Sequence, residues 1–174
     1  SQGIEDAVRP FGGEVVYTRV GSPVVTREML RRSAVFGGEE NGGLIFPKFQ
    51  LARDGGMTAA AVLDFLARSP KSLGDSLRDL PQYALVKEKV ECPVALRQPV
   101  LEALSREFAN EGARVVTIDG VKVLHDDGWV LLRPSGTEPL IRVFAEAKDP
   151  ARATKLAQDG LARVRAAIQR LGAG

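Results

Sequence analysis

Apolar residues in the first half of the chain alternate between helical and extended spacing. Ala59, Val62, Leu63 and Leu66 stand at positions i, i+3, i+4 and i+7, which predicts a helix with one buried face. Leu73, Leu77 and Leu80 predict a short amphipathic helix that Pro81 stops.

The remaining segments of this half read as short helices and strands. We expect helices over residues 4–9 and 27–32, and strands over 14–18, 34–36 and 44–46. The alternation predicts an α/β domain with a mixed sheet and helices, covering residues 1–80.

The second half follows a different pattern, in which several strands succeed one another. Strands are expected over residues 83–90, 115–118, 121–124, 129–133 and 140–147. The Asp119-Gly120 pair is the two-residue signal for a type I′ hairpin, and antiparallel pairing follows from it.

Two helices complete this half. One is expected to begin at Pro99, to bury Val100, Leu101, Leu104 and Phe108, and to end at Gly112. The other is expected to begin after Asp149 with Pro150 in its first turn, and to bury Leu161, Val164, Ile168 and Leu171. Residues 81–174 therefore read as a small α+β domain, with two helices covering an antiparallel sheet.

Composition narrows the classes of function. The 174 residues are 44% hydrophobic and 26% charged, which is typical of globular proteins, and the net charge of +2 gives no footprint for nucleic acid or a membrane surface. A single cysteine, Cys92, forms no internal disulfide and lacks the spacing of a zinc or redox site. No apolar run approaches the roughly 20 residues that span a bilayer. We expect a cytoplasmic protein without nucleic-acid or membrane partners.

The most informative segment runs from Arg133 to Pro139 and is followed by Arg142. Arginine offers a planar charged fork for phosphate, Ser135 and Thr137 offer hydroxyls, and glycine at 136 lets backbone N–H groups approach an anion. This combination suits a phosphate cradle. An ordinary loop between two strands uses the same residue types, so the residues alone leave both readings open.

A second segment, residues 38–43, carries Glu39, Glu40 and Asn41 among three glycines. A carboxylate beside an amide in a glycine-rich loop suits the hydroxyls of a sugar, which both donate and accept hydrogen bonds. A solvated acidic turn is the alternative. We expect no metal site here, because histidine is absent nearby and only Asp54 could assist.

The order of these two loops resembles the third and fourth domains of the α-D-phosphohexomutases, the phosphomannomutase/phosphoglucomutase family, over nearly the whole chain. Glu39 matches the glutamate of the family's Gly-Glu-x-Ser-Gly sugar loop, Asn41 replaces its usual serine, and Gly43 replaces a histidine common in bacterial members. This form resembles archaeal-type members. The segment from Thr18 to Gly21 also resembles a family segment near the substrate.

The resemblance implies roles for individual residues. Glu39, Asn41, Gly42 and Gly43 are expected to contact sugar hydroxyls, and Arg133, Ser135, Gly136 and Thr137 to bind the phosphate that is not being transferred. It also implies an α/β third domain whose first strand is missing here, and a C-terminal domain like that of the TATA-binding protein.

The family transfers phosphate through a phosphoserine in a Ser-His-Asn-Pro-type loop and binds Mg²⁺ through an Asp-Gly-Asp-Gly-Asp-type loop. Neither loop occurs in this chain. The resemblance thus implies the substrate-recognition half of an intramolecular phosphotransferase that interconverts hexose 6-phosphate and hexose 1-phosphate, with mannose or glucose as the sugar. Hexose 1,6-bisphosphate would be the intermediate and activator. We expect no catalytic or metal-binding residue in these 174 residues, and no activity from them alone.

Three alternatives remain at this point. The chain could be part of a phosphoglucosamine mutase, or a stand-alone phosphosugar-binding module without catalysis, or a stable but non-functional truncation. A separately encoded N-terminal half, carrying domains one and two, is the partner that the resemblance implies.

Overall fold

The computed structural model describes residues 1–172 and divides into two compact units. One unit joins residues 1–14 to the chain from Pro81 onward, and the other is Val15–Leu80. This division differs from the expected domains 1–80 and 81–174 in the first fourteen residues. Their helix α1 (Gln2–Val8) belongs with the C-terminal unit because the backbone N–H of Gln2 donates to Glu146 at 2.7 Å and the Tyr83 hydroxyl donates to Asp6 at 2.6 Å.

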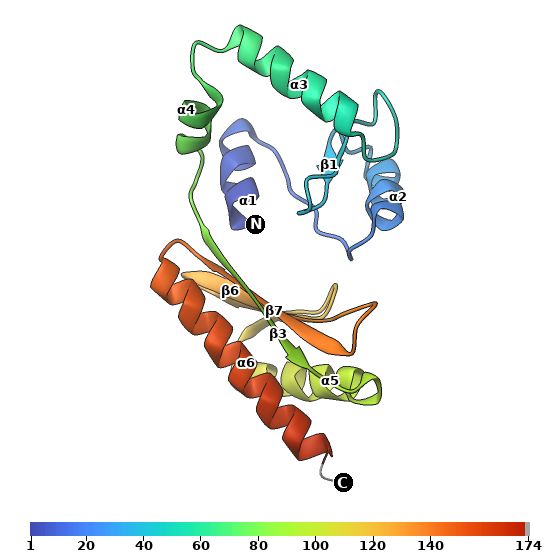
Figure 1. Ribbon diagram of the computed structural model, residues 1–174, viewed down its shortest axis with the longest axis vertical. Coiled ribbons are helices and arrows are strands. Elements are labelled where there is room, and N and C mark those ends of the chain that lie inside the picture. The colour runs from blue at the N-terminus through green and yellow to red at the C-terminus, as the bar shows by residue number, and fades with distance from the viewer. Residues whose placement is uncertain (173–174) are drawn as a thin grey trace. The chain divides into compact units, whose positions relative to one another are not determined.

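The C-terminal unit is built on a five-stranded antiparallel sheet of order β3-β7-β6-β5-β4 (Figure 1). The strands are β3 (Ala84–Glu91), β4 (Arg114–Val116), β5 (Val121–His125), β6 (Gly128–Pro134) and β7 (Leu140–Ala147). Helices α5 (Val94–Asn110) and α6 (Pro150–Gly172) cover one face. The expected α+β architecture is therefore confirmed.

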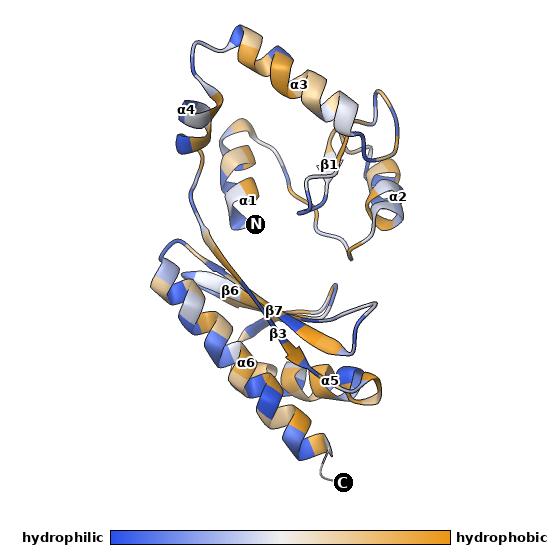
Figure 2. Ribbon diagram, viewed as in Figure 1, coloured by the Kyte–Doolittle hydropathy of each residue, from blue (hydrophilic) through white to orange (hydrophobic). Residues whose placement is uncertain are grey.

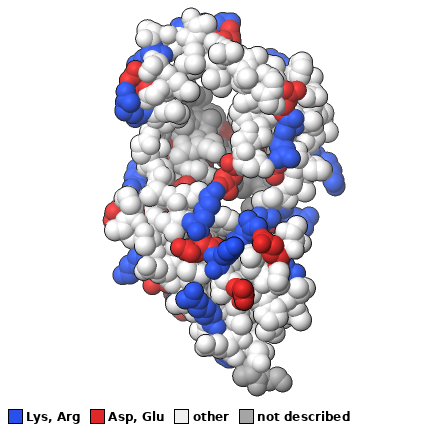
Figure 3. All heavy atoms as spheres, in the orientation of Figure 1, with Lys and Arg blue, Asp and Glu red and all other residues white. Residues whose placement is uncertain are grey.

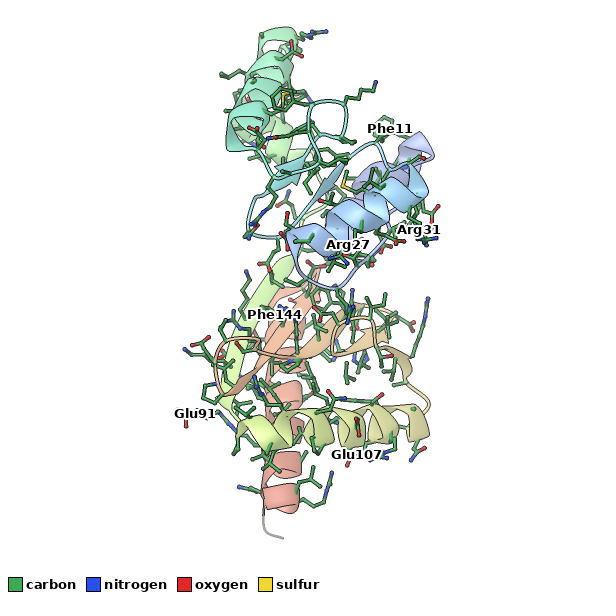
Figure 4. The ribbon with its side chains drawn as sticks, turned by 90° about the vertical axis from the view of Figure 1, so that its right-hand side faces the viewer. Phe11, Arg27, Arg31, Glu91, Glu107 and Phe144 are labelled. Atoms are coloured by element: carbon green, nitrogen blue, oxygen red, sulfur yellow. The ribbon has the colours of Figure 1, made fainter. Side chains whose placement is uncertain are left out.

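Alternation along the strands places the core between the sheet and the two helices. Val123, Leu132, Val143 and Leu104 are fully buried there. Side chains at the intervening positions lie on the opposite face of the sheet, as Phe144 does (Figure 4). One face of the sheet is therefore packed against α5 and α6, and on the other face Glu146, which accepts from Gln2 of α1, is 2% exposed.

Both helices bury most of the faces expected from the sequence. The four apolar residues expected on α5 are all buried. On α6, Val164 is buried and Leu161 and Ile168 pack against the core, while Leu171 remains 36% exposed near the helix end. The Asp149 carboxylate accepts a hydrogen bond from the N–H of Ala151 at 3.0 Å, so it caps α6 as expected.

Two local expectations in this unit are wrong. Helix α5 begins at Val94, with Pro99 inside it rather than at its first position. The β4–β5 connection is also longer than a type I′ turn, because Val116 pairs with Lys122 across residues 117–121. A type I′ turn needs positive φ at both central residues, whereas only Gly120, at φ +92°, has it here.

The other unit contains helices and short strands. They are α2 (Ser22–Arg32), β1 (Gly37–Gly38), β2 (Leu44–Ile45), α3 (Gly55–Arg68) and α4 (Leu73–Arg78). β1 and β2 form an antiparallel pair. The strand expected over residues 14–18 does not form among the described residues, and the one expected over 34–36 lies instead at Gly37–Gly38. A strand forms only where its backbone pairs with that of a neighbouring strand, and neither sheet of the described chain includes residues 14–18.

The apolar stripe of α3 is exposed, contrary to the sequence-based expectation. None of its residues is buried, and Leu63 is 66% exposed. Figure 2 shows apolar residues along this helix. Within Val15–Leu80, Met29 and Ile45 are the hydrophobic residues that the structure buries. The helical period was predicted correctly, but no described segment of this unit covers the apolar face.

Charged side chains of both signs are interspersed on the face drawn in Figure 3, which agrees with the small net charge. Among residues 1–172, no helix is both long enough and apolar enough to cross a lipid bilayer.

Candidate functional site

The candidate phosphate loop joins β6 to β7 in the C-terminal unit. It closes on itself through three hydrogen bonds: Ser135 N–H to Leu140 C=O at 3.0 Å, Leu140 N–H to Glu138 C=O at 2.8 Å, and Glu138 N–H to the Ser135 hydroxyl at 3.2 Å. Ser135 is 4% exposed. The serine therefore holds the shape of the loop, while its O–H group is still able to donate to a ligand.

The tip of the loop presents backbone donors. In the described part of the chain, the N–H groups of Gly136 and Thr137 have no protein acceptor, and both residues are exposed. A Cβ added at Gly136 would meet nothing within 4 Å. Paired N–H groups beside open space can receive the oxygens of an anion.

Two arginines stand next to each other at the base of the loop. Arg133 on β6 and Arg142 on β7 are directly opposite in the sheet register. Each has a carboxylate partner, since Arg133 Nε lies 2.8 Å from Asp119 and Arg142 Nη2 lies 2.9 Å from Glu138. An anion at the loop would thus meet two neighbouring positive charges, each already paired with a carboxylate.

Arg97 is a residue that the sequence reasoning missed. It lies in the first turns of α5, and its Nη1 atom donates to the carbonyl oxygens of Ser135 and Glu138, the latter at 3.1 Å. It lies 38 residues before Ser135 in the sequence and belongs to no loop motif, so no local signal could have identified it.

The candidate sugar loop connects β1 to β2 in the other unit. Glu39 N–H donates to the carbonyl of Gly43 at 3.0 Å, and Gly42 N–H donates to the carbonyl of Glu39 at 3.1 Å. Gly42 has φ +86°, a conformation that favours glycine. The Asn41 side-chain oxygen accepts from Gly43 N–H at 3.2 Å, so this amide shapes the turn.

Glu39 is largely enclosed, with a side chain 13% exposed. One carboxylate oxygen accepts from Gly21 N–H at 3.0 Å, and the other lies 3.3 Å from Arg53 Nη1. The Thr18–Gly21 segment, which the sequence associated with this loop, therefore meets it through Gly21. Each carboxylate oxygen has a further lone pair available to a hydroxyl donor.

A cavity of about 420 Å³, wide open to solvent, adjoins the sugar loop. It is lined by Asn41, Gly42, Gly43, Arg53, Asp54 and Gly55. Three of the four expected sugar-binding residues thus share one cavity, while Glu39 contacts it only through Arg53. The sequence did not identify Arg53, which packs so closely on Gly43 that a Cβ there would lie 2.1 Å from Arg53 Cδ.

The described residues contain no candidate metal-binding site. Residues 1–172 bring together no group of three or more His, Cys, Asp or Glu side chains suited to a metal ion.

Comparisons with known proteins agree with this division into two loops on two domains. The family model "Phosphoglucomutase/phosphomannomutase, alpha/beta/alpha domain III" matches residues 1–83, and the model "Phosphoglucomutase/phosphomannomutase, C-terminal domain" matches residues 86–163. The chain belongs to the phosphoglucomutase/phosphomannomutase family and carries its third and C-terminal domains.

Relatives include archaeal proteins. The chain is 37% identical over 95% of its length to a phosphoglucomutase/phosphomannomutase of Thermococcus kodakarensis and 40% identical over 95% to a probable phosphoglucosamine mutase of Methanopyrus kandleri. It spans 36% and 37% of these two proteins, or just over one third of their length. A phosphoglucomutase/phosphomannomutase family structure from Burkholderia thailandensis has a TM-score of 0.77 and 28% identity, covering 92% of this chain and 34% of that one.

Proposed function

We propose that this chain is the substrate-recognition part of a phosphohexomutase that interconverts hexose 6-phosphate and hexose 1-phosphate. The observation that carries the proposal is the β6–β7 loop, where the unsatisfied N–H groups of Gly136 and Thr137 lie on a loop that Arg133 and Arg142 flank at its base. The family membership of both domains supports it.

In this proposal, Arg133, Ser135, Gly136 and Thr137 hold the phosphate that stays in place during each transfer. Hydrogen bonds to a charged group contribute about 1.5–3 kcal/mol each, so three or four of them suffice for a specific anion site. Glu39, Asn41, Gly42 and Gly43 contact sugar hydroxyls, with the Glu39 carboxylate accepting and its position fixed by Gly21 and Arg53.

The reaction implied for the complete enzyme passes through a bisphosphate that returns its other phosphate to a serine outside these residues. The residues of this chain bind and orient the sugar phosphate in both directions, and they supply neither nucleophile nor metal. We therefore propose that the 174 residues alone bind ligand without turning it over.

The second candidate substrate is glucosamine phosphate. It is favoured by the relatives from Methanopyrus kandleri and Pyrococcus abyssi, whose names are "Probable phosphoglucosamine mutase". The 2-amino group of that sugar would need an acceptor at the position where glucose and mannose carry a hydroxyl. Glu39, Glu40 and Asp54 are the carboxylates of the sugar-loop region that could provide it.

Isothermal titration with glucose 1,6-bisphosphate tests the proposal. We expect the chain to bind weakly, Arg133→Ala to reduce the affinity at least about tenfold, and Arg106→Ala, an exposed position on α5, to leave it unchanged. Absence of binding to the unsubstituted chain, or equal binding by both variants, would contradict it. Glucosamine 1-phosphate and mannose 1-phosphate in the same assay distinguish the candidate sugars.

A further inference from the structure

Arg97 links helix α5 to both ends of the β6–β7 loop. Its Nη1 atom donates to the carbonyl oxygens of Ser135 and Glu138, one at each side of the Gly136-Thr137 tip. The Glu138 carbonyl also accepts from Leu140 N–H at 2.8 Å. For the Ser135 carbonyl, Arg97 is the donor that the described residues provide.

The hydrogen bond from Arg97 to the Ser135 carbonyl also determines where the Gly136 N–H points. In a trans peptide, the C=O of one residue and the N–H of the next point to opposite sides, and the described chain contains no cis peptide. The Ser135 carbonyl points towards Arg97, so the Gly136 N–H points away from α5, towards the open side of the loop. A Cβ added at residue 136 would also meet nothing within 4 Å, so the surroundings of this residue are open.

Glycine makes the opposite orientation accessible. Because Gly136 tolerates φ and ψ values closed to other residues, the Ser135–Gly136 peptide could rotate and direct its carbonyl oxygen to the open side. A carbonyl there would repel a phosphate oxygen, and the anion would lose one N–H donor. Opposing this rotation requires a donor behind the loop, which is the position of Arg97.

We propose that Arg97 is a positioning residue that orients the Ser135–Gly136 peptide so that the Gly136 N–H faces the bound phosphate. The inference rests on the proposed function, because it assigns the peptide a ligand. Arg97 itself does not touch the ligand. Its guanidinium acts through two carbonyls, so its loss changes the loop and leaves the Arg133 side chain in place.

The test measures the affinity of the chain for inorganic phosphate by ¹⁵N NMR titration. Variants Arg97→Met and Arg97→Lys are compared with Arg106→Met, an exposed arginine on the same helix with no contact to the loop. We expect Arg97→Met to weaken phosphate binding about tenfold, Arg97→Lys to recover most of the loss, and Arg106→Met to have no effect. The Gly136 amide resonance should move in ligand-free Arg97→Met and stay in Arg106→Met.

The outcomes separate the two claims. If the unsubstituted chain binds phosphate, Arg133→Met abolishes binding and Arg97→Met binds normally, the positioning role is wrong while the proposed function stands. If the unsubstituted chain binds no phosphate, both are wrong. Melting temperatures identify a variant that unfolds. Should Arg97→Met do so, Arg97→Gln replaces it and must show the same loss of affinity for the inference to hold.

Discussion

The Nε atom of Arg133 lies 2.8 Å from a carboxylate oxygen of Asp119, and both side chains are about one quarter exposed. Asp119 belongs to the connection between β4 and β5, whereas Arg133 is the last residue but one of β6, beside the candidate phosphate loop. The carboxylate therefore orients the guanidinium and at the same time neutralises part of the charge that an anion would meet.

Replacing Asp119 by asparagine separates these two effects. The amide keeps the shape of the side chain beside Arg133, but the negative charge is gone. We expect Asp119→Asn to tighten the binding of glucose 1,6-bisphosphate about three- to tenfold. Isothermal titration measures it, with Asp126→Asn in the exposed β5–β6 turn as the control. Weaker binding by Asp119→Asn would show that Arg133 needs the full charge for its orientation.

The close contact between Gly43 and Arg53 gives a prediction for the sugar loop. A methyl group at residue 43 would overlap the Arg53 side chain, which must then move away from Glu39. Overpacking of this kind costs about 1–3 kcal/mol. We expect Gly43→Ala to lower the free energy of unfolding by this amount in urea, and Gly55→Ala, where a Cβ meets nothing within 4 Å, to leave it unchanged or raise it. Equal stability of the two variants would contradict the packing described here.

The Tyr83–Asp6 hydrogen bond makes the attachment of α1 sensitive to high pH. The bond to Asp6, with a further contribution from burial, raises the pKa of Tyr83 from 10.0 to about 12. A group whose pKa is raised on folding contributes stability that is complete below its unfolded value, so this contribution is lost as the pH rises from about 10 to about 12. At the acid end, the hydrogen bond from Tyr83 lowers the pKa of Asp6, and that contribution is lost as the pH falls below 3.8.

Ultraviolet titration of tyrosinate checks the alkaline part. The chain has two tyrosines, and we expect a higher ionisation step, near 12 and due to Tyr83, that is absent from Tyr83→Phe. In Asp6→Asn the higher step should move down towards 10. A single step near 10 in the unsubstituted chain would show that the hydrogen bond is absent in solution.

Cys92 offers a probe for the opening of the C-terminal unit. Its side chain is 1% exposed, and burial raises the pKa of the thiol. Because the thiolate is the reactive form, we expect alkylation by iodoacetamide at pH 8 to be slow and to accelerate with urea in parallel with unfolding. Labelling as fast as that of the unfolded chain in the absence of urea would contradict the burial of Cys92.

Sequence patterns predicted the C-terminal unit better than the other one. Alternating apolar residues such as Val121 and Val123 predict strand β5, and its partner β6 follows after a two-residue turn. The pairing register and the buried positions are therefore encoded within a short stretch of sequence. The period of α3 was equally visible, yet Leu63 is exposed, because periodicity identifies an apolar face and says nothing of the surface that covers it.

In the candidate site, too, residues within a short motif could be predicted from the sequence, and residues that reach it from elsewhere could not. Arg133 and Gly136 stand in a recognisable motif, while Arg97 and Asp119 reach that motif from a helix and a loop elsewhere in the chain. Contacts of this kind depend on how the folded chain brings distant segments together. No pattern within a window of a few residues contains them.

We propose that the β6–β7 loop binds phosphate through its backbone N–H groups. The most direct measurement is a ¹⁵N–¹H NMR titration of the chain with glucose 1-phosphate, following the amide resonances of Gly136 and Thr137, with Gly112 at the end of α5 as an internal control. We expect the first two resonances to shift together and to saturate, and the third to stay in place. Unchanged Gly136 and Thr137 resonances at saturating ligand would contradict the account.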